Sequence, residues 1–450
     1  MGIFKAYDIR GVFGEELTPE IAYRIGRCLT RVVPAKRALV GRDARVSSTA
    51  IRDALVRGLI ESGCSVDDMG LASTPMVYFA TASKGYELSV QITASHNPAN
   101  YNGLKISRKG ALPVGGDTGL AELEKLVNAD LPAAVANSGA TVSKVDYLTD
   151  FAAFLRKWLP DLSGLKLAVD CSDGMASLTA HELFGDAATY VADKPDGTFP
   201  NHPPNPFEAA GRTLIVDTVR KTGADVGIIY DGDADRMMVI DENGDFVRPD
   251  LMIAVIAKRF LREYPGSAIL QDIRTSRGVT ETLAEAGARP EIWKVGHAFA
   301  KVKMREINAA CGGELAGHYY FRDFFWCDSG ELASLVALGE IAEAHRRGIT
   351  VSQLVKPIDR YANTGELNYT VTDKDAAIDA VRLDALAFGE PTRTMDFDGY
   401  RIEFADWWIS VRASNTEPYV RLILEAKSAD MLAARRASAE RAIEPFIVRK

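Results

Sequence analysis

Continuous runs of apolar residues alternate with amphipathic stretches along the first three quarters of the chain. The apolar runs end in polar loops at 38–45, 88–98, 165–174, 224–236 and 268–276. Stretches with helical periodicity lie between them, at 49–62, 251–263 and 331–346. Uninterrupted apolar strands suit a sheet that is covered on both faces by helices. The alternation therefore predicts an α/β architecture, in which ligands bind at the carboxyl ends of the strands.

Similar strand-to-loop segments recur and suggest repeated domains. VGRDAR (40–45), VDCSDG (169–174) and LQDIRTS (270–276) each place charged residues after an apolar strand. Their spacing, about 100–130 residues, is near the usual length of a domain. The end of the chain has shorter strand-like segments and a terminal helix from 428, which is typical of a smaller α+β domain. We therefore expect several similar α/β domains and a smaller one at the end, with breaks near 138–147, 241–250 and 356–366.

Composition and charge narrow the class of protein. The 53 basic and 61 acidic residues give a net charge of −8, which argues against a binder of nucleic acid or of membrane surfaces. No apolar stretch has the length of a spanning helix, and the N-terminal residues are charged where a signal peptide would be apolar. The five scattered cysteines lack CxxC spacing, so we expect a reducing, cytoplasmic environment. The oligomeric state stays open.

Three acidic residues form the first candidate site. Asp231, Asp233 and Asp235 occupy alternate positions of a loop that follows the apolar run VGIIY. Carboxylates at this spacing can converge on one hard cation, and without a cation they repel each other. An EF-hand is a rival interpretation, but Arg236 stands where that loop needs glycine, and the strand-like run MMVI follows. A solvated acidic turn is the alternative without a metal. The pattern favours a Mg²⁺ site where the strand ends.

The segment TASHNP (93–98) is the second candidate site. Its Asn-Pro pair favours a turn that presents Ser95 outward. A serine hydroxyl needs a base or a phosphorylated resting form in order to react. A serine hydrolase is the competing enzyme class, but the GxSxG elbow is missing, and we expect adjacent side chains such as Ser95 and His96 not to point at each other. Lys105 could neutralise a transferring phosphoryl group. An ordinary turn is the remaining alternative.

The segment RASNTEP (412–418) is the third candidate site. An arginine followed by hydroxyl and amide side chains, on a loop that ends in proline, is suited to binding phosphate. The guanidinium supplies a bidentate fork, and hydroxyl and backbone N–H groups supply shorter contacts. A plain loop is the alternative interpretation.

Together these segments resemble the α-D-phosphohexomutase superfamily, most closely its bacterial phosphomannomutase/phosphoglucomutase branch. The motifs stand in family order over nearly the whole length: KAYDIRG (5–11), TASHNP (93–98), DGDADR (231–236), GHAFAK (296–301), GGELAGHYYFRD (312–323) and RASNTEP (412–418). The resemblance implies three similar mixed-sheet α/β domains, at 1–143, 144–246 and 247–358, and a smaller C-terminal α+β domain at 359–450, around a central cleft. It also implies an enzyme that interconverts hexose 1-phosphate and 6-phosphate, of mannose or glucose, through a phosphoserine and a hexose 1,6-bisphosphate.

The resemblance assigns roles residue by residue. The residues expected to be catalytic are Ser95, the phosphoserine, Lys105 and Arg10, which would stabilise charge or act in proton transfer, and Arg236, which would lie beside the metal and the phosphate. The residues expected to hold Mg²⁺ are Ser95, through its phosphate, and Asp231, Asp233 and Asp235. The residues expected to bind the sugar phosphate are Tyr7, Arg274, His297, Glu314, His318, Arg412, Ser414, Asn415 and Thr416. The last four would hold the phosphate that is not being transferred.

Two positions depart from the family pattern. Ala316 stands where the sugar-binding loop usually has serine, which removes a hydrogen bond worth about 0.5–1.5 kcal/mol. Arg274 stands where lysine is commoner, and the two cations bind phosphate with different geometry. Phosphoglucosamine mutase is the nearest rival function, although its usual RxSGTEP and GEQSGH motifs both differ here. A metal-dependent sugar phosphatase and a non-catalytic sugar-phosphate binding protein are two more distant rivals.

Overall fold

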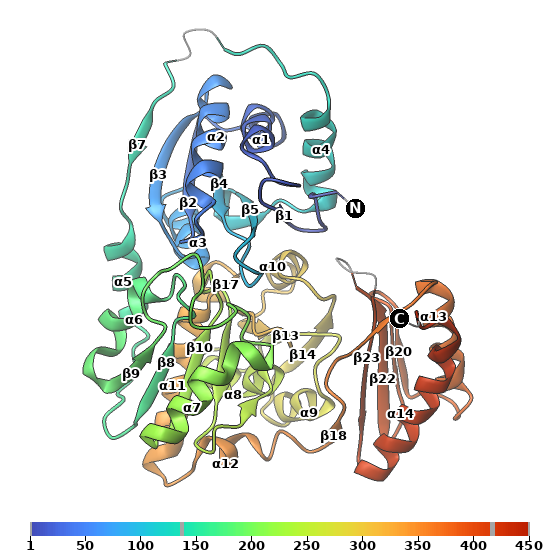
Figure 1. Cartoon of the computed structure of the whole chain (residues 1–450). Coiled ribbons are helices and arrows are strands. Elements are labelled where there is room, and N and C mark those ends of the chain that lie inside the picture. Colours follow the sequence, from blue (N-terminus) through green and yellow to red (C-terminus); the bar gives the residue numbers. More distant parts are fainter. Residues whose placement is uncertain (1, 136–138, 415–418, 449–450) are drawn as a thin grey trace.

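The computed structural model describes residues 2–135, 139–414 and 419–448. Figure 1 shows four units that follow one another along the chain, from a blue N-terminal unit through green and yellow units to a red C-terminal unit at one side. Each unit is built on its own β-sheet, and helices pack against each sheet. The predicted fold class is confirmed: three mixed-sheet α/β domains are followed by a different C-terminal domain.

The first domain has a mixed sheet. Its strands are β1 (Ile9–Val12), β2 (Arg37–Arg42), β3 (Ser65–Leu71), β4 (Leu88–Ile92), β5 (Tyr101–Arg108), β6 (Leu112–Pro113) and β7 (Val142–Lys144). Its helices are α1 (Pro19–Val32), α2 (Ser48–Glu61), α3 (Thr74–Ser83) and α4 (Leu120–Asn128). The strand order is β1-β5-β4-β2-β3-β7, with β6 beside β5. Because β2 runs parallel to β3 and β4, the loops after β2 and β4 meet at one edge of the sheet.

The second domain continues the chain with α5 (Leu148–Arg156). Its strands are β8 (Leu167–Asp170), β9 (Ala188–Val191), β10 (Val226–Tyr230), β11 (Met237–Ile240) and β12 (Phe246–Val247), and its other helices are α6 (Ser177–Phe184) and α7 (Ala209–Thr222). The order is β12-β11-β10-β8-β9. The run MMVI forms β11 antiparallel to β10, so the strand that was expected in place of an EF-hand helix is confirmed.

The third domain has the same kind of mixed sheet. Its strands are β13 (Ala268–Asp272), β14 (Arg289–Trp293), β15 (Cys311–Gly313), β16 (Tyr319–Phe321) and β17 (Cys327–Asp328), and its helices are α8 (Pro249–Glu263), α9 (Arg277–Glu285), α10 (His297–Glu306), α11 (Gly330–Arg346) and α12 (Val351–Val355). The order is β14-β13-β15-β16-β17. The helices predicted at 251–263 and 331–346 are confirmed, with starts one or two residues earlier.

The C-terminal domain is antiparallel throughout its described strand pairs. Its strands are β18 (Ala362–Asn363), β19 (Leu367–Thr370), β20 (Arg393–Met395), β21 (Tyr400–Glu403), β22 (Trp407–Ala413) and β23 (Tyr419–Ala426), and its helices are α13 (Lys374–Leu386) and α14 (Ala429–Ile443). The hydroxyl of Ser428 caps α14 by accepting from the N–H of Met431, which explains why this helix begins where the sequence predicted it.

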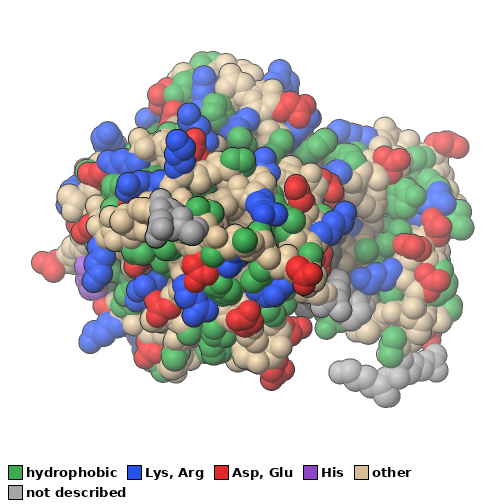
Figure 2. Space-filling model, turned by 90° about the horizontal axis from the view of Figure 1, so that it is seen from above, with side chains coloured by type: hydrophobic (Ala, Val, Ile, Leu, Met, Phe, Trp, Pro, Cys, Tyr) green, Lys and Arg blue, Asp and Glu red, His purple; other side chains and the backbone are tan. Residues whose placement is uncertain are grey.

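The hydrophobic core is divided unequally. One buried cluster joins the second and third domains to α3 of the first, and it includes Val77, Ile228, Val255 and Leu335. The C-terminal domain has a separate cluster between its sheet and its two helices. Basic and acidic side chains are intermingled over the face seen in Figure 2, where the C-terminal domain stands beside the other three. Among the described residues, no helix is long and apolar enough to cross a membrane.

Candidate active site

A cavity of about 410 Å³ lies where the four domains meet. The predicted site residues that line it are Tyr7, Arg10, Ser95, Lys105, Arg236, Arg274, His297, Glu314 and His318. Arg421 contributes from the C-terminal domain. Arg412 and Ser414 are buried but do not reach the lining of this cavity in the described part of the chain. Asn415 and Thr416 lie outside the described residues.

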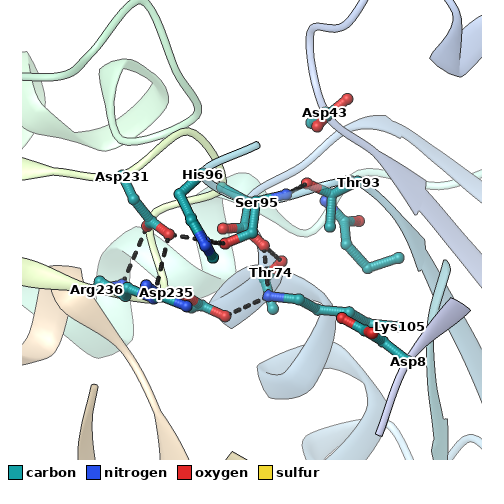
Figure 3. Close-up of polar contacts among 12 residues, drawn as sticks. Asp8, Asp43, Thr74, Thr93, Ser95, His96, Lys105, Asp231, Asp235 and Arg236 are labelled. Carbon is teal, nitrogen blue, oxygen red and sulfur yellow. Dashed lines mark hydrogen bonds and ion pairs between the residues drawn. The ribbon is translucent and has the colours of Figure 1, made fainter. Parts of the chain in front are cut away.

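Ser95 sits in the loop that leaves β4. Its backbone has a φ of 51°, in the left-handed region, and this conformation costs a non-glycine residue about 1–3 kcal/mol. The N–H of Ser95 donates to Oγ1 of Thr93 at 2.8 Å. The Ser95 hydroxyl donates to Oδ2 of Asp231 at 2.8 Å, across the boundary between the first and second domains. Figure 3 shows this hydroxyl pointing at the carboxylate on the loop that faces it.

The three carboxylates of the metal loop lie behind Ser95. Asp231, Asp233 and Asp235 are fully buried, and one carboxylate oxygen from each lies within 4.8 Å of the others. The Lys105 ammonium donates to Asp233 at 2.7 Å and also pairs with Asp235. Nε of Arg236 lies 3.7 Å from Asp231. In these contacts two cations face three fully buried carboxylates, which leaves an excess of negative charge.

The excess negative charge shifts the pKa values of the groups in this cluster. Burial raises the pKa of Asp231 well above its ordinary value, and the charges of Asp233 and Asp235 raise it further. Burial alone would lower the pKa of Lys105, but Asp233 and Asp235 outweigh it and raise that pKa. Oδ1 of Asp233 and Oδ1 of Asp235 are buried and have no hydrogen-bond partner among the described residues. Unpartnered hard oxygen donors that converge in this way fit a divalent cation such as Mg²⁺.

The orientation of the His96 side chain differs from the prediction. Its Nδ1 lies 3.2 Å from the Ser95 hydroxyl, so the expectation that adjacent side chains would not point at each other is wrong here. The left-handed backbone at Ser95 turns both side chains to the same side of the loop. Burial lowers the pKa of His96 well below its ordinary value, and Arg236 and Arg10 lower it further. The imidazole is therefore neutral at pH 7.

Glu314 and His318 stand on the wall that the third domain contributes. Glu314 accepts hydrogen bonds from the N–H of Gly296 at 3.1 Å and from the Tyr320 hydroxyl at 2.5 Å. Nδ1 of His318 lies 2.7 Å from Asp328, and its Nε2 accepts from Nε of Arg236 at 2.9 Å. These contacts fix the orientation of both side chains before a ligand arrives, because each is held by a buried partner.

His297 begins α10 and faces the same cavity. Neither of its ring nitrogens has a partner among the described residues, although the side chain is buried. Burial lowers its pKa well below the ordinary value, and Lys301 adds to this. The Tyr7 ring packs edge-on against the imidazole with 5.2 Å between the ring centroids. A neutral imidazole with both nitrogens open can donate to one ligand hydroxyl and accept from another.

Arg274 and Arg412 lie on either side of the boundary between the third and C-terminal domains. Arg274 pairs with Asp272 at 2.7 Å and with Glu366 at 3.3 Å. Nε of Arg412 lies 3.6 Å from Asp398, whose carboxylate accepts from the N–H of Val295 at 2.9 Å. The arginine of the predicted phosphate loop is thus connected to the segment that precedes His297.

Several residues around the cavity were not singled out from the sequence. Thr74 donates to Asp233 at 2.6 Å from the first turn of α3. Glu366 lies 3.0 Å from Arg421 as well as near Arg274. Arg45 binds the loop that carries Ser95. The segment GRDAR (41–45) follows a predicted strand and resembles QDIRT (271–275). This likeness is the sequence feature that points to Arg45. Thr74 and Glu366 carry no local motif that would have marked them.

Comparison with known proteins extends over nearly the whole chain. It matches family models described as phosphoglucomutase/phosphomannomutase alpha/beta/alpha domain I at residues 1–133, domain II at 146–244, domain III at 248–361 and the C-terminal domain at 366–442. It is 38% identical to a phosphomannomutase of Salmonella montevideo and 36% identical to one of Escherichia coli K12, with 94% of each chain covered in both cases. The crystal structure of a phosphoglucomutase/phosphomannomutase family protein from Burkholderia thailandensis superposes with a TM-score of 0.88 at 31% identity, over 99% of this chain and 98% of that one.

The fold and the cavity thus define a phosphohexomutase, an enzyme that transfers phosphate within a sugar. A serine hydrolase, an EF-hand protein and a non-catalytic binding protein do not fit these findings. The chain belongs to the phosphoglucomutase/phosphomannomutase family.

Proposed function

We propose that this phosphohexomutase interconverts the 1-phosphates and 6-phosphates of mannose or glucose through a phosphorylated Ser95. One observation carries the proposal: the Ser95 hydroxyl lies 2.8 Å from Asp231, on the loop whose three carboxylates fit a cation. Relatives over 94% of this chain are named phosphomannomutases, which supports a hexose phosphate as the substrate. The buried free thiols are compatible with a cytoplasmic enzyme.

The proposed reaction has two transfers. In the first, the bond between phosphorus and Oγ of Ser95 breaks as a bond forms between phosphorus and the free sugar hydroxyl oxygen, and the proton of that hydroxyl is transferred to Oγ as it leaves. The resulting hexose 1,6-bisphosphate turns around within the cleft. In the second, Oγ of Ser95 attacks the other phosphate, which restores the phosphoserine and releases the isomeric monophosphate. Such transfers depend mainly on positioning and on neutralisation of charge.

The chain supplies that neutralisation around Ser95. We assign charge stabilisation or proton transfer to Lys105 and Arg10, and we place Arg236 beside the metal and the phosphate; all three line the cavity beside the nucleophile. Asp231, Asp233 and Asp235, together with the phosphate on Ser95, would hold Mg²⁺. When bound, Mg²⁺ would neutralise negative charge on the phosphoryl oxygens.

The substrate site must bind the sugar in two orientations. We assign contacts with sugar hydroxyls to Tyr7, His297, Glu314 and His318, because these groups are fixed by partners or open towards the cavity. Arg274 is assigned to phosphate. We assign the phosphate that is not transferred to the loop from Arg412 to Thr416, where Asn415 and Thr416 stay a prediction from the sequence. Arg412 and Ser414 would reach it if the C-terminal domain closes on the sugar.

The test compares Ser95→Ala with wild-type enzyme. Intact mass measurement of wild type should detect one phosphoryl group, located on Ser95 by peptide mapping, and the variant should lack it. Turnover of mannose 1-phosphate to mannose 6-phosphate should fall by roughly 10⁴-fold or more, since the nucleophile is absent. Ser62→Ala, which removes a hydroxyl near the end of α2, is the matched control and should keep both properties.

Different results would identify a different function. Active wild-type enzyme that never carries phosphate on Ser95 would refute the proposal. Free phosphate released in step with loss of substrate would identify a sugar phosphatase. A kcat/KM for glucosamine 1-phosphate above those for mannose and glucose 1-phosphates would identify a phosphoglucosamine mutase.

A further inference from the structure

Arg45 is buried directly behind the loop that carries Ser95, and its side chain has 0% exposure. Its guanidinium donates four hydrogen bonds to main-chain carbonyls of this loop. Nη2 binds the carbonyls of Ser95 at 2.9 Å and Asn97 at 2.6 Å, and Nη1 binds those of Pro98 at 2.6 Å and Tyr101 at 3.1 Å. One planar cation therefore spans the whole turn between β4 and β5.

The guanidinium is itself held firmly. Nε of Arg45 lies 3.1 Å from Oδ2 of Asp43, and the other oxygen of Asp43 accepts from the Arg45 main-chain N–H at 3.1 Å and from the Ser48 hydroxyl at 2.5 Å. The ring of Phe199, from the second domain, lies 5.0 Å from the guanidinium carbon. A buried ion pair with this many partners has one preferred position, because each donor that lost its acceptor would be left unsatisfied.

The loop that carries Ser95 has a strained backbone, which these hydrogen bonds stabilise. Ser95 adopts a left-handed backbone that is strained for a residue with a Cβ. Its carbonyl lies between Arg45 on one side and the metal loop on the other, since a Cβ on Gly232 would lie only 2.7 Å from that oxygen. The backbone of Ser95 sets the direction of its Cα–Cβ bond, from which the hydroxyl reaches Asp231. A donor that fixes the carbonyl therefore fixes the nucleophile.

We propose that Arg45 is a positioning residue for phosphoryl transfer, which holds Oγ of Ser95 in place both when it donates the phosphoryl group and when it attacks the bisphosphate. This inference rests on the proposed function of Ser95. Arg45 binds the Ser95 loop through main-chain carbonyls and is not among the described residues that line the cavity, so it acts on the rate of transfer rather than on the binding of the sugar.

The third domain contains the same local motif with a different outcome. The N–H of Arg274 donates to Oδ1 of Asp272 at 2.7 Å, as the N–H of Arg45 does to Asp43, and each arginine pairs with its own aspartate. The guanidinium of Arg274 nevertheless lines the cavity. The same Asp-x-Arg turn therefore places an arginine near the site in both domains, but the two arginines bind different groups. In the first domain Arg45 binds the loop that carries Ser95.

The test uses Arg45→Lys in the full chain, with Arg27→Lys as the matched control. Arg27 is a buried arginine of the same domain that donates to the carbonyl of Pro132 at 2.5 Å, and it does not line the cavity. A lysine ammonium at position 45 cannot span four carbonyls. We expect kcat to fall by about 10- to 100-fold, as for other displacements of a reacting group by about 1 Å, with KM for the sugar phosphate within about twofold of wild type. The rate at which hexose 1,6-bisphosphate phosphorylates Ser95 should fall by the same factor.

Arg27→Lys should leave kcat and this phosphorylation rate unchanged. A wild-type kcat in Arg45→Lys, a change in KM alone, or an equal loss of kcat in both variants would overturn the inference. If Arg45→Lys does not fold, Asp43→Asn provides the same measurement: a lower kcat at constant KM supports the role, and a wild-type kcat overturns it. Wild-type enzyme assayed beside them separates the two proposals, because the absence of phosphoserine and of mutase product in wild type would overturn both.

Discussion

At the scale of single residues, the site is organised by buried charges that satisfy one another only in part. Lys105 and Arg236 offset most of the charge of the three aspartates, and Thr74 donates to Asp233. The oxygens that have no hydrogen-bond partner among the described residues, Oδ1 of Asp233 and Oδ1 of Asp235, are the ones that a cation would use. Removing one member of such a cluster leaves an uncompensated buried charge, which costs more than the net stabilisation of the pair.

Ala316 provides a prediction at this scale. It lines the cavity between Glu314 and His318, and Ala316→Ser would add a hydroxyl there. One further neutral hydrogen bond to the sugar is worth about 0.5–1.5 kcal/mol, so kcat/KM should rise about 2- to 10-fold for mannose 1-phosphate, glucose 1-phosphate or both. Steady-state kinetics with both sugars measures the change. Ala284→Ser, on the exposed side of α9, is the control, and unchanged values for both sugars in Ala316→Ser would contradict the prediction.

At the scale of elements, the first domain depends on a close approach of α1 and α2. A Cβ on Gly26 would lie 2.3 Å from the carbonyl oxygen of Leu55, and one on Gly58 would lie 2.3 Å from that of Tyr23. Each contact is with backbone, which cannot move aside as a flexible side chain could. The two glycines thus set the distance between the helices that cover the strands leading to Arg45 and Ser95.

Gly58→Ala should therefore destabilise the protein although alanine favours a helix. Overpacking costs about 1–3 kcal/mol, and at this distance from backbone we expect it to exceed the propensity gain of about 1 kcal/mol. Thermal unfolding followed by circular dichroism should show a lower Tm. Gly339→Ala in α11 is the matched control, because its Cβ would meet only Pro160, at 3.6 Å and beyond. That variant should keep or raise the Tm, and a Gly58→Ala protein as stable as wild type would show that the helices can separate at little cost.

At the scale of the whole molecule, three domains meet at one carboxyl group. Glu331, in the first turn of α11, accepts from the Ser73 hydroxyl of the first domain at 3.3 Å and from the Thr179 hydroxyl of the second at 3.1 Å. The next residue after Ser73 is Thr74, which binds Asp233. The junction of the three α/β domains thus lies directly behind the metal loop, whereas the C-terminal domain has its own core.

Glu331 makes the stability of this junction depend on pH. Burial raises the pKa of Glu331 to about 8, whereas in the unfolded chain it is near the ordinary value of about 4.3. Between these values the folded protein retains a proton that the unfolded chain has lost, so stability falls as pH rises. Glu331→Gln removes this dependence, and its Tm relative to wild type should rise by a few degrees between pH 5 and pH 8. Glu343→Gln, an exposed position on the same helix, is the control, and a constant difference in Tm for Glu331→Gln would contradict the assignment.

The sequence by itself determined several strands and helices and the chemistry of the loops that follow them, because these depend on neighbours in the chain. The strands expected within 224–236 and 268–276 are present as β10 and β13. The recurring Asp after a strand, at Asp43, Asp170 and Asp272, forms the same turn in all three α/β domains, with the N–H two residues later bound to the carboxylate. Periodicity and turn chemistry are local, so they can be read from the sequence.

Only the tertiary structure decided which of these loops meet. Ser95 reaches Asp231 across 136 positions of sequence, and Lys105 reaches Asp233 across 128. The contact of Ser95 with His96, the bonds from Arg45 to the loop carbonyls and the junction at Glu331 follow from a strained backbone and from domain packing, and no local pattern encodes them. Burial and the charges of residues from other domains then shift the pKa values of the groups that meet. Neither cause can be read from the local sequence.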